Sequence, residues 1–160
     1  LQHFFIDRIS TPLRVSLQHP IFNSKEGSED ENNVDRAVIQ IAVKLFEIIE
    51  TSLEEFPPVM KGVICWLSKR VAEKFPGEQH KVIAGFLFLR LICPILVSST
   101  VDLGFDILPE WKPHLLRVTR YLQLIANQNT ITETHCSDPD KLQNCQLRAT
   151  QMFRYFTDIE

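Results

Sequence analysis

The fold of this chain is decided by one apolar stretch, residues 82–97, which reads VIAGFLFLRLICPILV. Thirteen of its sixteen residues are apolar, and the exceptions are Gly85, Arg90 and Pro94. Burying an arginine is costly unless it is paired, and a proline inside a helix removes a backbone donor. The stretch is too short and too interrupted for a membrane span. It therefore predicts a core helix over about residues 79–97, hydrophobic nearly all round because neighbouring helices cover it.

The segments on either side of this stretch also show helical periodicity. The clearest runs over residues 34–49, where apolar residues recur along one face at Val34, Val38, Ile41, Ala42, Leu45 and Ile49. A helix carrying Val63, Leu67 and Val71 begins at Pro57-Pro58 and stops before Pro76-Gly77. Further helices are predicted over 1–17, with an interruption at Pro12, over 113–128 and over 140–157. We expect an all-α fold of about six helices.

Composition narrows the class of protein. With 160 residues and 44% hydrophobic content, the chain is long enough for one domain with a real core, spanning residues 1–160. The net charge of −3 gives no global basic field, so we expect no nucleic-acid partner. The four cysteines and five histidines do not have the spacing of a zinc site. The first residues also lack the basic region followed by an apolar region that is typical of a signal peptide. These features favour a cytoplasmic protein without a metal site, with a polar, exposed loop over residues 23–33.

The predicted helix over residues 113–128 has two unlike faces. One arc is wholly apolar and consists of Leu115, Val118, Leu122, Ile125 and Ala126. The other mixes cations, amides and leucines: Arg117, Arg120, Gln123, Asn127, Leu116 and Leu124. Periodicity alone permits two interpretations of this second arc, a solvated surface or a face that binds a partner.

Residues 85–98 (GFLFLRLICPILVS) resemble the signature of Ras GTPase-activating (RasGAP) domains, in which a Phe-Leu-Arg triplet precedes Pro-Ala by three residues. Residues 120–127 (RYLQLIAN) are similar to the second signature of that family. The Phe-Pro-Pro at 56–58 and the Phe-Pro at 75–76 resemble proline motifs that separate helices at similar spacing in neurofibromin-type domains. The resemblance covers most of the chain and implies a helical RasGAP-like fold.

The resemblance also implies a function. Such domains bind GTP-bound Ras-type small GTPases and stimulate GTP hydrolysis, because an arginine finger stabilises charge on the transferring phosphoryl group. The GTPase itself binds GTP and magnesium, so the domain would need no cofactor and would perform no autonomous catalysis. Ras is lipid-anchored, so recruitment to membranes would fall to flanking domains, and we expect no direct membrane insertion by this chain.

The resemblance assigns roles to residues of both signatures. Arg90 corresponds to the arginine that braces the finger loop; the alternative is a buried arginine that only ties the core together. Phe88 and Leu89 belong to the same motif, and Pro94 would kink the helix so that it forms part of a groove.

In the second signature, Arg120 stands where the family usually has lysine and would face the acidic surface of the GTPase. Gln123 and Asn127, with Leu124, would line the same groove. Arg117 is a further candidate, and its alternative role is that of a solvated cation.

The sequence departs from the family pattern at three points. Ile95 replaces an alanine, and Glu133 puts an acid where the family often has lysine. No Leu-Phe-Arg finger motif occurs, since neither Arg8 nor Arg14 has that context. Either the finger precedes residue 1 or the parent protein lacks it. An alternative function is therefore a non-catalytic RasGAP-related scaffold that binds an active GTPase without stimulating hydrolysis, and a third interpretation is a helical domain with no GTPase partner.

Overall fold

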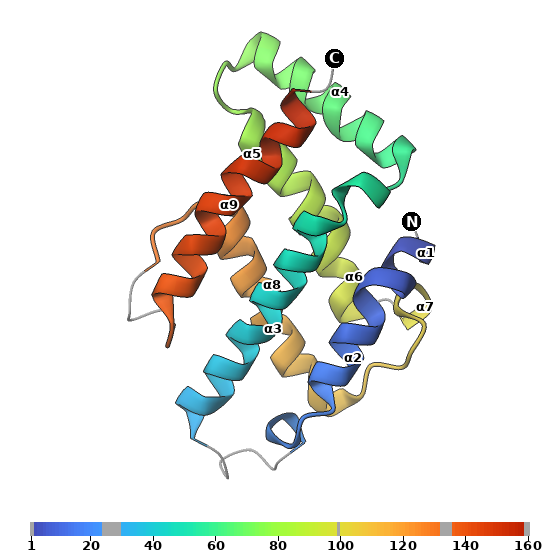
Figure 1. Ribbon diagram of the computed structural model, residues 1–160, viewed down its shortest axis with the longest axis vertical. Helices are drawn as coiled ribbons and strands as arrows, with labels where there is room; N and C mark the ends of the chain where they lie inside the picture. Colours follow the sequence, from blue (N-terminus) through green and yellow to red (C-terminus); the bar gives the residue numbers. More distant parts are fainter. Residues whose placement is uncertain (1, 24–29, 99, 132–135, 159–160) are drawn as a thin grey trace.

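The computed structural model describes residues 2–23, 30–98, 100–131 and 136–158 (Figure 1). Within these ranges the chain is helical and contains no strand, so the all-α prediction is confirmed. The helices are α1 (Gln2–Phe4), α2 (Thr11–Leu17), α3 (Glu31–Thr51), α4 (Pro58–Lys74), α5 (Gln79–Ala84), α6 (Cys93–Ser98), α7 (Thr100–Leu103), α8 (Lys112–Asn127) and α9 (Pro139–Thr157). Two π-helical segments, η1 (Phe5–Ser10) and η4 (Gly85–Ile92), and three short 3₁₀ turns, η2 (Pro20–Phe22), η3 (Leu53–Glu55) and η5 (Pro109–Trp111), complete the order. The short α7 was not predicted.

Helix α3 forms the centre of the bundle, with α9 beside it and α8 behind it in the view of Figure 1. It buries the stripe predicted from its periodicity: Val34, Val38, Ile41, Ala42, Leu45 and Ile49. Arg148 of α9 is ion-paired with Glu47 and Glu50 of α3, and its guanidinium lies 5.6 Å from the centre of the Phe46 ring. Packing and this ion-pair cluster together hold α9 against α3.

The segments α5, η4 and α6 form one continuous helix, Gln79–Ser98, here called the central helix. Among the described helices it is the one long and apolar enough to cross a membrane. It lies instead against α4, α8 and α9 within the bundle. Its buried residues are Ile83, Ala84, Leu87, Phe88, Ile92, Cys93, Ile95 and Leu96. The predicted core helix is therefore confirmed.

Both π-helical segments end two residues before a proline, η1 before Pro12 and η4 before Pro94. A proline cannot donate to the carbonyl four residues earlier, and its ring crowds that carbonyl. In the central helix the Cys93 N–H instead bonds to the carbonyl of Phe88, five residues back, which widens the turn. At Pro12 the predicted interruption is a change of helix type and not a break, because the π-helical η1 ends at Ser10 and α2 continues from Thr11 to Leu17.

Candidate functional site

Arg90 lies at the surface of the central helix. It is exposed, as are Pro94 and Leu89, the last at 39%. The interpretation of Arg90 as a buried tie within the core is thus wrong, because neighbouring helices cover most of the central helix but leave this stripe in solvent. The guanidinium Nη1 donates to the Gly85 carbonyl at 3.4 Å, so the side chain lies back along its own helix.

Two other residues of the first signature, Phe88 and Ile95, face inward. Phe88 is fully buried, and its ring centre lies 6.4 Å from that of Phe153 on α9 in an edge-to-face contact. Ile95, which replaces the family's alanine, is 7% exposed and belongs to the core. The side of the central helix that carries the sequence departure at Ile95 is therefore not the side that carries Arg90.

The mixed face of α8 is also at the surface. Arg120 and Asn127 are exposed, and Leu116 beside them is 58% exposed. Gln123 and Leu124 are half-buried at the two margins of this face. The predicted apolar arc of α8 is buried in full, as Leu115, Val118, Leu122, Ile125 and Ala126. Leu116 was not among the predicted groove residues, although its place in the mixed arc pointed to the same face.

The exposed face of α8 adjoins the exposed stripe of the central helix. The Cys93 thiol contacts the carbonyl of Thr119 on α8 at 3.8 Å, and the Gln123 side chain also hydrogen-bonds Cys93. Burial raises the pKa of this thiol to about 11, so it stays neutral. Gln123 thus lies where α8 contacts the central helix. On the central helix, Arg90 and Pro94 lie next to Cys93 and are exposed.

We call this combined region the seam surface. It consists of Leu89, Arg90, Pro94, Leu116, Arg120, Gln123, Leu124 and Asn127. At one end Asn127 helps to line a pocket of about 430 Å³ together with Gly77, His80, Lys81, Ala126, Gln128 and Asn129. The structure therefore brings the predicted residues of the two signatures onto adjoining faces.

The two arginines of the seam surface are available for a partner. Within the described residues, no carboxylate forms an ion pair with Arg90 or Arg120. An unpaired cation on an exposed face attracts an acidic partner, even though the whole chain carries a net charge of −3. The surface can thus supply local positive charge, amide hydrogen bonds and apolar contacts.

Arg117 forms ion pairs within the domain that the sequence did not predict. Its guanidinium contacts Asp35 Oδ1 at 2.7 Å and Glu31 Oε1 at 2.8 Å, so it is not merely a solvated cation. The Tyr121 hydroxyl donates to Asp35 Oδ1 at 2.5 Å, and Ser137 donates to Oδ2 through its N–H at 2.9 Å and its hydroxyl at 2.7 Å. We call this group the Asp35 cluster; it joins α3, α8 and the residues preceding α9.

Asp35 remains ionised in this cluster. Its burial disfavours the charged form, but hydrogen bonds from Tyr121, Ser137 and Arg117 outweigh that effect and hold the pKa of the carboxyl below its usual value. Sequence reasoning missed Asp35, because no local pattern links it to partners 82 to 102 positions away.

Other predictions fall elsewhere. Glu133 and residues 24–29 of the acidic loop lie outside the described residues. Arg8 forms an ion pair with Glu55, and Arg14 is exposed on α2. Among the described residues, no three or more His, Cys, Asp and Glu side chains are grouped so as to hold a metal ion.

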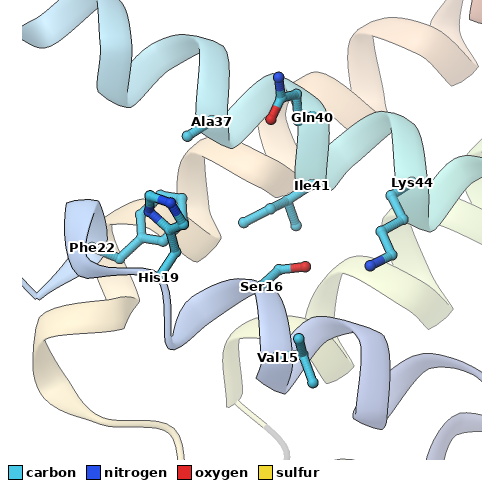
Figure 2. Close-up of a pocket in the computed structure, with 8 residues that line it drawn as sticks. All are labelled: Val15, Ser16, His19, Phe22, Ala37, Gln40, Ile41 and Lys44. Atoms are coloured by element: carbon cyan, nitrogen blue, oxygen red, sulfur yellow. The ribbon is translucent and has the colours of Figure 1, made fainter.

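A separate pocket of about 390 Å³ lies between α2, η2 and α3 (Figure 2). Its lining residues are Val15, Ser16, His19, Phe22, Ala37, Gln40, Ile41 and Lys44. The Ser16 hydroxyl is already bonded to the Pro12 carbonyl at 2.8 Å. None of the predicted site residues lines this pocket, which is distinct from the seam surface.

Comparison with known proteins places the chain in a family. Residues 8–127 match the family model of the GTPase-activator protein for Ras-like GTPase. The inhibitory regulator protein IRA2 of Saccharomyces cerevisiae is 30% identical over 98% of this chain and 5% of its own length. Ras GTPase-activating protein 1 of Homo sapiens is 31% identical over 64% of this chain and 10% of its own length. The chain thus spans only a small part of these relatives. On the matched domain and the two signatures, the chain belongs to the RasGAP family.

Proposed function

We propose that the seam surface binds the GTP form of a Ras-type small GTPase and that the chain supplies the docking and bracing part of a GTPase-activating domain. The observation that carries this proposal is the exposure of Arg90 and Arg120 on adjoining helices, with no acidic partner for either in the described part of the chain. Arg120 would attract the acidic surface of the GTPase.

The reaction itself would take place in the partner. Activation requires an arginine aimed at the charge that develops on the phosphoryl group, and the GTPase holds the nucleotide and the magnesium ion. We infer that this arginine comes from sequence outside the chain. Within it, Arg8 is engaged with Glu55 and neither Arg8 nor Arg14 has the family's finger motif. Arg90 would hold the finger loop through its guanidinium donors without entering the nucleotide site.

The same observation supports a second candidate, a scaffold domain that binds the active GTPase without stimulating hydrolysis. The two functions differ in whether transition-state charge is neutralised, because docking alone does not lower the barrier. Single-turnover GTP hydrolysis by a panel of Ras-family proteins separates the two functions. It is measured with this chain and with a form extended upstream by about forty residues, which would add a finger arginine that precedes residue 1. Acceleration by the extended form supports activation; GTP-dependent binding without acceleration supports the scaffold.

The docking role is tested by binding measurements on Arg120→Ala. We expect an affinity about ten-fold lower for the GTP-bound partner, equivalent to about 1.4 kcal/mol, and an unchanged fold. Arg154→Ala is the matched control, because Arg154 is an exposed cation of α9 outside the seam surface. Equal affinities for the wild type and Arg120→Ala would remove the seam surface from the binding site.

A further inference from the structure

Helix α4 has an outward face that nothing in the described structure covers. It buries only Ile64 and Ser68 of its 17 residues. It lies along the upper edge of the molecule in Figure 1 and packs mainly on α5 and α9. Most of its surface is therefore open, in contrast to the fully occupied inner face of α8.

The open side carries a continuous stripe of apolar and basic residues. Val59 is 76% exposed, Val63 37% and Trp66 58%. Arg70 and Lys74 follow at offsets of eleven and fifteen from Val59, which places all five on one side of the helix. Phe75, 62% exposed, comes directly after the helix. We call these six residues the α4 face; it combines apolar anchors with cations, and clustering of this kind marks an interaction surface.

The charge of α4 is opposite to that of the whole protein. The helix holds four basic residues and one acidic residue, Glu73, and so has a net charge of +3 in a chain of net charge −3. Glu73 bonds to Arg70 at 2.9 Å. Of the acids next to the two ends of α4, Glu55 is paired with Arg8 and Glu78 with Lys81, whereas Glu54 is exposed. Within the α4 face the two cations Arg70 and Lys74 outnumber the neighbouring Glu73, so the face carries a small excess of positive charge.

The geometry points to an anionic lipid surface as the occupant of the α4 face, and we propose that α4 adsorbs there at the level of the headgroups. Tryptophan and phenylalanine next to lysine and arginine are the composition favoured at a membrane interface. The stripe lies on a single outer helix. A shallow hollow of about 500 Å³ lies between Trp66 and Phe75, where Arg70 and Lys74 can bind a phosphate-bearing headgroup. Glu73 also lines this hollow, but its carboxylate is held by Arg70. Adsorption of this kind needs no membrane span.

Vesicle binding tests the proposal directly. We expect the chain to sediment with vesicles of phosphatidylcholine containing about one third phosphatidylserine, but not with phosphatidylcholine alone, and to be released by high salt. The chain has two tryptophans, and Trp111 is 6% exposed. A blue shift of the fluorescence on the anionic vesicles therefore reports on Trp66.

Two pairs of substitutions separate the contribution of charge to vesicle binding from the contribution of apolar burial. Arg70→Ala with Lys74→Ala should weaken binding about ten-fold, because each basic residue near an anionic surface contributes but Glu73 already offsets part of Arg70. Trp66→Ala with Phe75→Ala should weaken it at least about ten-fold through lost apolar burial. Leu147→Ala, which removes a 71% exposed leucine from α9, is the control and should bind as the wild type does.

Three results would overturn the proposal. One is the absence of sedimentation with anionic vesicles at low salt. Another is binding that survives both pairs of substitutions while circular dichroism shows each variant folded. The third is concentration-dependent self-association that Trp66→Ala with Phe75→Ala abolishes, since the α4 face would then serve a second copy of the chain. None of these results bears on GTPase binding, which is measured separately through Arg120.

Discussion

Arg117 and Arg120 are three residues apart on the same helix, yet the structure gives them different tasks. Arg117 points toward α3, where Asp35 and Glu31 hold its guanidinium. Arg120 is exposed and has no acidic partner among the described residues. The position of each cation relative to the neighbouring helix decides its role: one fixes the place of α8, and the other remains available to a partner.

The comparison extends to the surroundings of the two arginines. The Asp35 cluster is largely buried, so its hydrogen bonds act in a medium less polar than water and an unpaired group there is costly. The seam surface is open to solvent, so its charges contribute little to folding and can act in binding. A helix can thus separate stability from recognition on its two sides.

The largest expected effect comes from breaking the cluster at its centre. Asp35→Ala leaves Arg117, Tyr121 and Ser137 without their common acceptor, and we expect a loss of about 3 kcal/mol in the free energy of unfolding, measured with urea. Glu31→Ala is the control, because Glu31 contacts the same arginine but its side chain is 80% exposed. It should cost less than about 0.5 kcal/mol. Equal losses for both variants would contradict the special role of the buried acid.

The paired substitutions Arg117→Ala and Arg120→Ala should give opposite results in two assays. The first should lower the free energy of unfolding by about 2 kcal/mol, because a charged hydrogen bond to Asp35 is lost while Tyr121 and Ser137 still satisfy that carboxylate. The second should stay within about 0.5 kcal/mol of the wild type. GTPase affinity should fall for Arg120→Ala more than for Arg117→Ala. If Arg120→Ala destabilised the fold more than Arg117→Ala, or if Arg117→Ala weakened GTPase binding more than Arg120→Ala, the assignment of stability to one face of α8 and binding to the other would be wrong.

Acid should weaken the cluster. The pKa of Asp35 is lowered in the folded state, so its ionisation stabilises the protein above the ordinary carboxyl pKa, and this contribution is lost as the pH falls below about 4. The wild type and Asp35→Ala should therefore differ less in unfolding free energy at pH 3 than at pH 6. Urea unfolding at both values checks this, and a constant difference would mean that folding does not lower the pKa of Asp35.

The last prediction concerns the contact between α8 and the central helix at Cys93. Burial raises the pKa of the Cys93 and Cys145 thiols to about 11, whereas Cys65 is only half-buried. Alkylation at pH 8, followed by mass spectrometry, should modify Cys65 first. The rate at Cys93 should be about one hundredth of the rate at Cys65, or lower. Fast labelling of Cys93 would show that α8 and the central helix separate in solution.

Most of the helices could be predicted from periodicity and proline placement. The buried stripes of α3 and of α8 match their apolar repeats, because a 3.6-residue period places those side chains on one side whatever surrounds them. The short α7 and the π-helical turns before Pro12 and Pro94 could not be predicted, since they depend on how packing accommodates a missing donor.

The site was predictable in part. The signatures pointed to Arg90, Arg120, Gln123 and Asn127, and the structure places all four on adjoining exposed faces. The apolar neighbours of Arg90 in sequence also permit a buried arginine, but which side of a helix is left uncovered depends on segments distant in sequence. The ion pairs of Arg117 with Glu31 and Asp35 were not predicted for the same reason.

The sequence by itself determined which residues are helical, which arcs are apolar and which family the two signatures resemble, because these properties are local and repeat along the chain. Only the tertiary structure decided that Arg117 is held by Asp35, that Arg90 reaches solvent and that the α4 face stays open. Those facts depend on contacts between residues tens of positions apart, and no local pattern encodes which helix covers which face.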